Sequence, residues 1–195
     1  ISVPQLLCDP SRLQLIHLDD FQYQGAFRLP DDTFNNSSLN YSQGPLEYNP
    51  VNHTIFVVGH AHHQKIAEFP IPELVDSFHI PDLNMAGPPL QGFADILGRI
   101  SGGNPQSLNR IGGLEVVNGP DGVELIINAY EYYDAPGDNS QTTAVAENSG
   151  NLAESDVAGF FTFQGGAGHT SGWISPVPPE WQPRLGGTHI TGQSS

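Results

Sequence analysis

The sequence predicts an all-β protein built from short antiparallel strands. Its 195 residues include 22 glycines and 17 prolines without a collagen-like period, so these residues divide the chain into short elements joined by turns. Runs of β-branched and aromatic residues lie between the turns, and one strand–turn–strand plan occurs twice. Long helices would be interrupted too often to form.

These β-branched and aromatic runs predict six strands along the chain. Residues 21–30 (FQYQGAFRLP) alternate aromatic and polar side chains before a proline, as a half-buried strand does. The other predicted strands are TIFVVGH (54–60), KIAEFPIP (65–72), GGLEVV (112–117), VELIINAYEYY (123–133) and GFFTFQ (159–164). The turn sequence NGPDG joins the fourth and fifth of the six.

The remaining segments have loop composition. Residues 87–107 predict a loop containing one helical turn at 93–100, and the acidic stretch 134–158 predicts a surface excursion. The segment 171–187 is proline-rich and is anchored by Trp173 and Trp181.

Gly44–His60 and Gly112–Tyr130 share one plan, at an offset of about 68 residues. Each begins Gly-x-Leu-Glu, passes through a turn and enters an apolar strand, so each is a hairpin that must stack on a neighbour. We therefore expect antiparallel sheets of β-propeller type in a single all-β domain or part of one. Because a propeller closes with ~4–8 blades, this chain would hold an incomplete set. The expected division is a lead-in (1–20), a first unit (21–80), a loop-rich connection (81–110) and a second unit (111–195).

Several segments resemble the N-terminal half of a family of secreted, largely uncharacterised bacterial proteins with a propeller-like fold. They are YQGAFRLP, LEYNPVNHTIFVVGH, IAEFPIP, IGGLEVV, AYEYYDA and VPPEWQPRLGGTHITGQ. The resemblance covers residues 21–193 except the acidic loop, and it implies the fold and secretion but no catalytic residue. It also implies that related chains continue beyond Ser195, so the C-terminal part of the same precursor is an expected partner, as are other copies of the protein.

The charge is strongly acidic, with 21 Asp and Glu against 6 Lys and Arg and a net charge of −15. Nucleic acid is therefore excluded as a partner, since its binding needs a basic surface. No apolar run reaches the ~20 residues of a transmembrane segment. The single Cys8 excludes an internal disulfide, and ISVPQLLCDP is typical of a mature N-terminus, so we expect a secreted, periplasmic or cell-surface protein. Four glycosylation sequons either mark a glycosylated surface or arise by chance in an Asn/Ser-rich loop: Asn35, Asn36, Asn40 and Asn52.

The stretch FVVGHAHHQK (56–65) carries the first candidate site. If the preceding strand continues, His60 and His62 share one side and could chelate a transition metal with a third ligand from elsewhere. The alternative is that Gly59 ends the strand and the imidazoles lie in a polar loop. The spacing favours this alternative, because a two-ligand motif specifies little.

The ends of the two repeated strands form the second candidate site. His60 and His62 align with Tyr130 and Tyr132, and Arg110 lies nearby in sequence. A histidine facing a tyrosine, with Arg110 neutralising a carboxylate, would suit β-elimination on an acidic carbohydrate. The alternative is that the tyrosines only pack, with solvated hydroxyls.

Asp134 and Asp138, in DAPGDN, offer oxygens for Ca²⁺ in a tight turn, although the stretch lacks the calcium-loop pattern. Two functions remain open. One is a non-catalytic extracellular scaffold, structural or ligand-binding, and the other is a secreted polysaccharide lyase or hydrolase that uses the His and Tyr residues.

Overall fold

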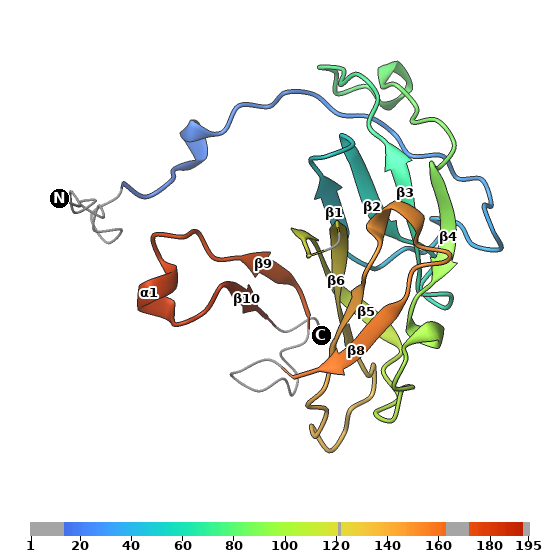
Figure 1. Cartoon of the computed structure of the whole chain (residues 1–195). Coiled ribbons are helices and arrows are strands. Elements are labelled where there is room, and N and C mark those ends of the chain that lie inside the picture. Colours follow the sequence, from blue (N-terminus) through green and yellow to red (C-terminus); the bar gives the residue numbers. More distant parts are fainter. Residues whose placement is uncertain (1–13, 121, 163–171, 193–195) are drawn as a thin grey trace.

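The protein is all-β and its sheets are antiparallel, as the sequence predicts. The computed structural model describes residues 14–120, 122–162 and 172–192 (Figure 1). The first sheet (sheet 1) runs in chain order through β1 (Leu46–Asn49), β2 (Thr54–Val58), β3 (Lys65–Pro70) and β4 (Gln91–Asp95).

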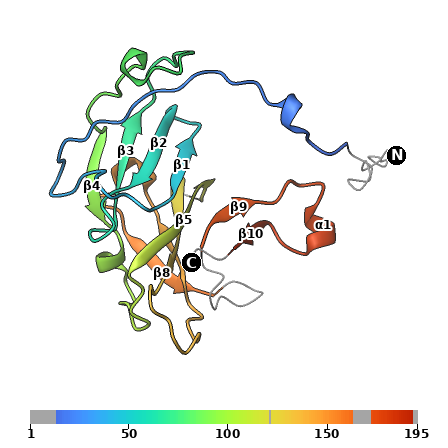
Figure 2. The ribbon, with the colours of Figure 1, turned by 180° about the vertical axis from the view of Figure 1, so that it is seen from behind.

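The second sheet (sheet 2) repeats this arrangement with β5 (Arg110–Asn118), β6 (Val123–Tyr130), β7 (Thr143–Ala146) and β8 (Val157–Phe161). A β9–β10 hairpin follows, with β9 (Ile174–Pro176) and β10 (His189–Thr191) joined through the short helix α1 (Gln182–Leu185). Figure 2 shows this hairpin beside β5 and away from β3 and β4. Four short 3₁₀ helices complete the described elements: Leu18–Asp20, Ile80–Asp82, Leu97–Arg99 and Ser149–Asn151.

The sequence repeat corresponds to the first hairpin of each sheet. Leu46 pairs with Val57 in the first hairpin, and Leu114 pairs with Ile127 in the second. The glutamate of each Gly-x-Leu-Glu motif therefore lies on the first strand of its sheet, at an equivalent register. Each hairpin continues into two more antiparallel strands, so each unit is a four-stranded meander.

Three strands lie where the sequence predicts loops: β4, β7 and β9, the last in the proline-rich segment 171–187. β4 falls in the segment read as a loop with one helical turn, of which only the turn at Leu97–Arg99 forms, as a 3₁₀ helix. β7 falls in the acidic stretch 134–158, which is therefore not wholly a surface excursion, since Ala144 and Ala146 are fully buried. In β7 the β-branched Thr143 and Val145 alternate with alanine over only four residues, so the signal by which strands are recognised is short and interrupted.

The strand predicted at 21–30 is not formed. Phe21 and Tyr23, whose alternation suggested it, are 71% and 50% exposed. The backbone makes only isolated bridges, at Ala26 and Arg28. This segment instead crosses the outer face of sheet 1 and packs its later apolar side chains, Phe27 and Leu29, against it.

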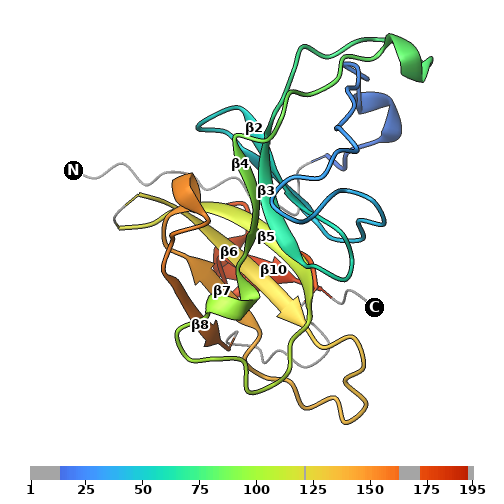
Figure 3. The same cartoon turned by 90° about the vertical axis from the view of Figure 1, so that its right-hand side faces the viewer.

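The main core lies between the two sheets, which Figure 3 shows one above the other. Sheet 1 contributes Phe56, Val58, Ile66 and Ala94, and sheet 2 contributes Leu114, Leu125, Ile127, Ala144 and Ala146. A second cluster covers the opposite face of sheet 1, where Phe69 and Phe93 meet the N-terminal segment. Sheet 1 is therefore buried on both faces.

Polar side chains also connect the two sheets. The Arg99 guanidinium donates hydrogen bonds to the carbonyl oxygens of Leu152, Ala153 and Ser155 in the β7–β8 connection. The Gln91 side chain bonds the same connection in both directions, donating to the Ser149 carbonyl and accepting from the Leu152 N–H. These contacts satisfy backbone groups that the interface would otherwise leave unpaired.

Candidate functional site

The three histidines lie together in the turn between β2 and β3. Strand β2 ends at Val58, so a His-x-His pair projecting from one strand face is not formed. The ring centroid of His60 lies 5.5 Å from that of His62 and 4.7 Å from that of His63. The His62 N–H donates to Nδ1 of His60, and Nδ1 of His63 lies 3.1 Å from the Ser37 hydroxyl. The turn is thus a cluster of neighbouring imidazoles at the end of sheet 1.

This crowding affects the titration of His60. Desolvation lowers the pKa of His60, and repulsion from His63 and His62 lowers it further. A neutral imidazole beside two others can accept a proton or a hydrogen bond from a ligand. Its closest aromatic neighbour outside the turn is Tyr41, in an edge-to-face contact at 5.8 Å.

Arg110 and Tyr132 form a second polar group, at the start of β5 and just after β6. The Arg110 guanidinium carbon lies 5.1 Å from the centre of the Tyr132 ring, within reach of a cation–π contact. Arg110 pairs with Tyr130 across the two strands, and its Nη1 donates to the Asn109 carbonyl. Tyr132 is 58% exposed, so the stacked pair faces solvent.

The two groups lie at the same end of the stacked sheets. Oε1 of Gln64, which follows the histidine turn, accepts a hydrogen bond of 2.6 Å from the Ile111 N–H at the start of β5. Within the part of the chain that the structure describes, however, no hydrogen bond or ring contact joins His60 or His62 to Tyr130 or Tyr132. The facing acid–base pair that the sequence suggests is not assembled.

Asp134 and Asp138 lie in one turn, where the Asp134 carboxylate accepts hydrogen bonds from backbone N–H groups. Oδ1 of Asp134 accepts from the N–H groups of Gly137 and Asp138, and Oδ2 accepts from that of Asn139. Burial raises the pKa of Asp134, but these hydrogen bonds outweigh it and leave the pKa below its usual range. The carboxylate therefore stabilises its own turn, while Asp138 is exposed.

Among the described residues, no group of three or more His, Cys, Asp or Glu side chains is placed to hold a metal ion. Both predicted metal sets, His60 with His62 and Asp134 with Asp138, thus lack a third ligand there. No helix in the described ranges is long and apolar enough to cross a bilayer.

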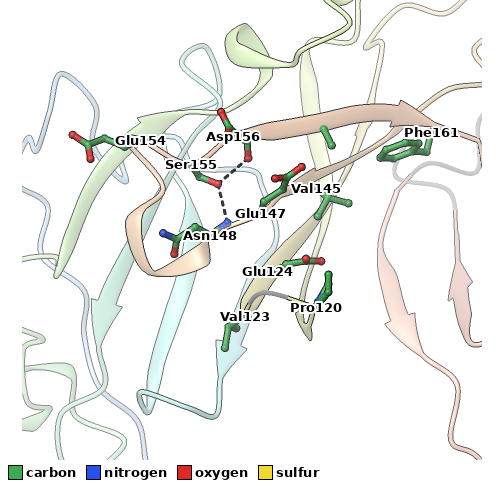
Figure 4. A pocket seen from close by; sticks show the side chains of 12 residues that line it. Pro120, Val123, Glu124, Val145, Glu147, Asn148, Glu154, Ser155, Asp156 and Phe161 are labelled. Carbon is green, nitrogen blue, oxygen red and sulfur yellow. Dashed lines mark hydrogen bonds between the residues drawn. The ribbon is translucent and has the colours of Figure 1, made fainter.

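The structure also contains a groove that the sequence did not indicate. It has a volume of about 700 Å³ and lies over the outer strands of sheet 2 (Figure 4). Its apolar lining includes Val123, Val145, Ala158 and Phe161, and its acidic lining is Glu124, Glu147, Glu154 and Asp156. Among the described residues that line it there is no Lys, Arg or His. We call this feature the open groove. These residues come from separate strands and their loops, so no local motif reveals it.

A second feature missed from the sequence is the pair of motif glutamates. Oε1 of Glu47 accepts a 3.2 Å hydrogen bond from the Val116 N–H, which ties sheet 1 to sheet 2. Glu115, the equivalent residue of sheet 2, lies 3.1 Å from Nε2 of His189 in β10. Burial raises the pKa of both carboxyls, and their mutual repulsion raises that of Glu47 further. The signal was present in the repeated Gly-x-Leu-Glu motif, whose glutamate recurs on a strand.

Comparison with protein-family profiles, with curated proteins and with solved structures finds no match to this chain.

Proposed function

We propose that this chain is an extracellular scaffold of β-propeller type, whose successive units stack face to face and whose loops at one end contact a ligand. In this proposal β1, β5 and β9 are the first strands of three consecutive units. The third unit is represented in the described residues by the β9–β10 hairpin.

The repeated contact of the motif glutamates carries the proposal. Glu47 reaches forward from the first unit to Val116 of the second, and Glu115 reaches forward from the second unit to His189 of the third. A motif glutamate thus contacts the next unit in both cases, although Glu47 meets its first strand and Glu115 its second, as expected for units that stack in succession. Close packing of β9 on β5 supports it, since a Cβ added at Gly113 would lie 2.5 Å from the Gly172 carbonyl oxygen.

A scaffold role fits the polar end of the sheets better than catalysis does. His62, His63, Tyr132 and Tyr133 are exposed there on loops held by rigid strands, which is the usual setting of a binding surface. Exposed aromatic and imidazole rings are suited to stacking on the apolar faces of sugar rings, so a carbohydrate is the ligand class we favour. Strong acidity and the resemblance to secreted proteins support an extracellular setting.

The test of the scaffold proposal begins with the protein purified from its native source. Intact-mass measurement should detect a second polypeptide held non-covalently, either the remainder of a precursor or another copy. A single species, monomeric in sedimentation, would contradict the assembly.

The ligand-binding part is tested by titration with neutral and acidic polysaccharides while amide chemical shifts are recorded. We expect perturbation at His62 and Tyr132 without turnover. Depolymerisation that is lost in His60→Ala would instead establish the lyase or hydrolase function.

A further inference from the structure

We propose that the open groove binds a two-stranded β-hairpin of another polypeptide, in which apolar side chains alternate with Lys or Arg. This inference rests on the proposed stacking of successive units, and it names the chemistry of the partner.

The described residues cover the outer face of sheet 2 only in part. Near β5 it is covered by the β9–β10 hairpin, through the Glu115–His189 contact and through Asn128, whose side-chain amide donates to the Gly172 carbonyl and the Thr191 hydroxyl. Farther out, Val123, Val145 and Ala158 are half-buried and Phe161 is 51% exposed. The open groove therefore continues an interface that already exists within the chain.

The shape of the occupant follows from the way sheet 2 packs on sheet 1. Where sheet 2 packs on sheet 1, β5 and β6 are followed in the sheet by β7 and β8. Ala144, Ala146 and Val157 of these two strands join the core shared with sheet 1. On the outer face of sheet 2, the β9–β10 hairpin occupies the position that β5 and β6 occupy on sheet 1. The open groove then lies where the equivalents of β7 and β8 would pack, and two antiparallel strands have the matching shape.

The chemistry of the occupant follows from the residues that line the open groove. Val145 and Ala158 offer an apolar floor, while four carboxylates line the same groove: Glu124, Glu147, Glu154 and Asp156. A strand alternates its side chains between two directions, so apolar residues can face the floor while basic residues on the rim reach the carboxylates. A second copy of this chain is a poor occupant, since its net charge is −15 and it has no Lys or Arg from Ile111 to Pro183.

The test uses three synthetic, cyclised hairpin peptides and the intact chain. The first alternates valine and lysine, the second replaces every lysine by glutamate, and the third contains the residues of the first in shuffled order. We expect the first peptide alone to perturb the amide shifts of Val145 and Ala158. Its affinity should fall as salt is raised, because the rim contacts are exposed ion pairs.

Variants assign the binding to the groove. Glu124→Gln with Glu147→Gln should weaken binding of the first peptide roughly tenfold, at about threefold for each carboxylate, since Glu147 is exposed and Glu124 is half-buried. Val145→Lys should abolish binding of the first peptide. If Val145→Lys perturbs the fold, Phe161→Ser replaces it as the test variant and should weaken that binding. Glu73→Gln, on an exposed carboxylate of the β3–β4 connection, should change nothing.

Equal binding of the glutamate or shuffled peptide would overturn the inference, as would no binding of the first peptide to a chain whose circular dichroism is native. Self-association of the chain that Val145→Lys abolishes would make a second copy the occupant and would also overturn it. The peptide results leave the proposed assembly untouched, because intact-mass and sedimentation measurements on the native protein test it separately. Self-association would support that assembly while overturning the hairpin partner.

Discussion

The Glu115 carboxylate lies 3.1 Å from Nε2 of His189, and it joins two segments that are distant in the sequence. The Glu115 side chain is almost fully buried, at 6% exposure, whereas that of His189 is 27% exposed. The other carboxylate oxygen, Oε2, is buried and has no hydrogen-bond partner among the described residues. A buried carboxylate that has one partner is costly to ionise, so the docking of the β9–β10 hairpin should respond to pH.

The direction of this response follows from the pKa of Glu115. Burial raises it above the ordinary value of 4.5, although His189 opposes the shift. A raised pKa means that the folded protein holds the proton more tightly than the unfolded chain. The resulting stabilisation is complete below about pH 4.5 and is lost as the pH rises through the folded-state pKa. Glu47, whose pKa is also raised by burial, acts in the same direction.

We therefore expect Glu115→Gln to gain stability relative to the wild type as the pH rises from 4 to 7 (roughly the span in which a raised Glu titrates). Urea unfolding at each pH measures the difference. Glu73→Gln is the matched control, because its carboxylate is exposed, and it should track the wild type throughout. If Glu115→Gln follows the wild-type pH profile, the carboxylate does not titrate in this range and the argument fails.

Gly113 provides a steric test of the same interface. A Cβ at this position would lie 2.5 Å from the Gly172 carbonyl oxygen and 2.9 Å from the Ile174 nitrogen. Gly113→Ala should therefore push β9 away from β5, at a cost of about 1–3 kcal/mol. Amide hydrogen exchange should accelerate at Ile174 while the Leu125 and Ile127 amides stay protected. In Gly187→Ala the nearest atom would lie 3.7 Å away, so exchange should not change. Unchanged protection of Ile174 in Gly113→Ala would contradict the close packing.

The strands that the sequence predicted correctly are those with a continuous β-branched or aromatic signal. The strands predicted at 54–60, 65–72 and 123–133 begin where β2, β3 and β6 begin but extend two or three residues too far, and GGLEVV falls within β5. β4 and β7 were missed because QGFAD and TAVA owe their place to packing against neighbours rather than to intrinsic propensity. The strand predicted at 21–30 does not form. Its aromatic and polar side chains do alternate, but no neighbouring strand of the described residues pairs with it.

The candidate site was less predictable than the fold. That Gly59 ends the strand and leaves the histidines in a turn was among the alternatives the sequence offered, and it is what the structure shows. The shared location of the histidines and Arg110 depends on Gln64, which bonds a residue 47 positions away. The open groove depends on three strands meeting. Neither relationship leaves a trace in local spacing, because both are set by how the sheets stack.

The histidine turn makes a spectroscopic prediction. Desolvation and the neighbouring imidazoles of His63 and His62 lower the pKa of His60. His63→Ala should therefore raise the pKa of His60, since a repelling charge is removed. Carbon-detected titration of the imidazole signals from pH 4 to 9 (roughly the range that brackets histidine) resolves each midpoint. His79→Ala, at an exposed imidazole paired with Asp82, is the control and should leave the His60 midpoint unchanged. A His60 midpoint that is the same in both variants would show that the turn is not electrostatically coupled.

Substitution of Arg99 tests the interface between the two sheets. The Arg99 guanidinium reaches three carbonyl oxygens of the β7–β8 connection and the Asp95 carbonyl on its own side. Lysine keeps the charge but cannot reproduce the planar fork, so Arg99→Lys leaves several carbonyls without a partner. We expect a loss of about 2–4 kcal/mol in the free energy of unfolding, measured with urea at pH 7.

Arg110→Lys is the matched control for Arg99→Lys. Among the described residues the Arg110 guanidinium donates only to the Asn109 carbonyl, and it lies over the exposed Tyr132 ring. Its cost should stay below about 1 kcal/mol. Equal losses in the two variants would mean that Arg99 contributes only its charge. The shared apolar core would then outweigh Arg99 in holding the two sheets together. Phe56→Ala, at a fully buried position of that core, should cost about 3–5 kcal/mol in the free energy of unfolding.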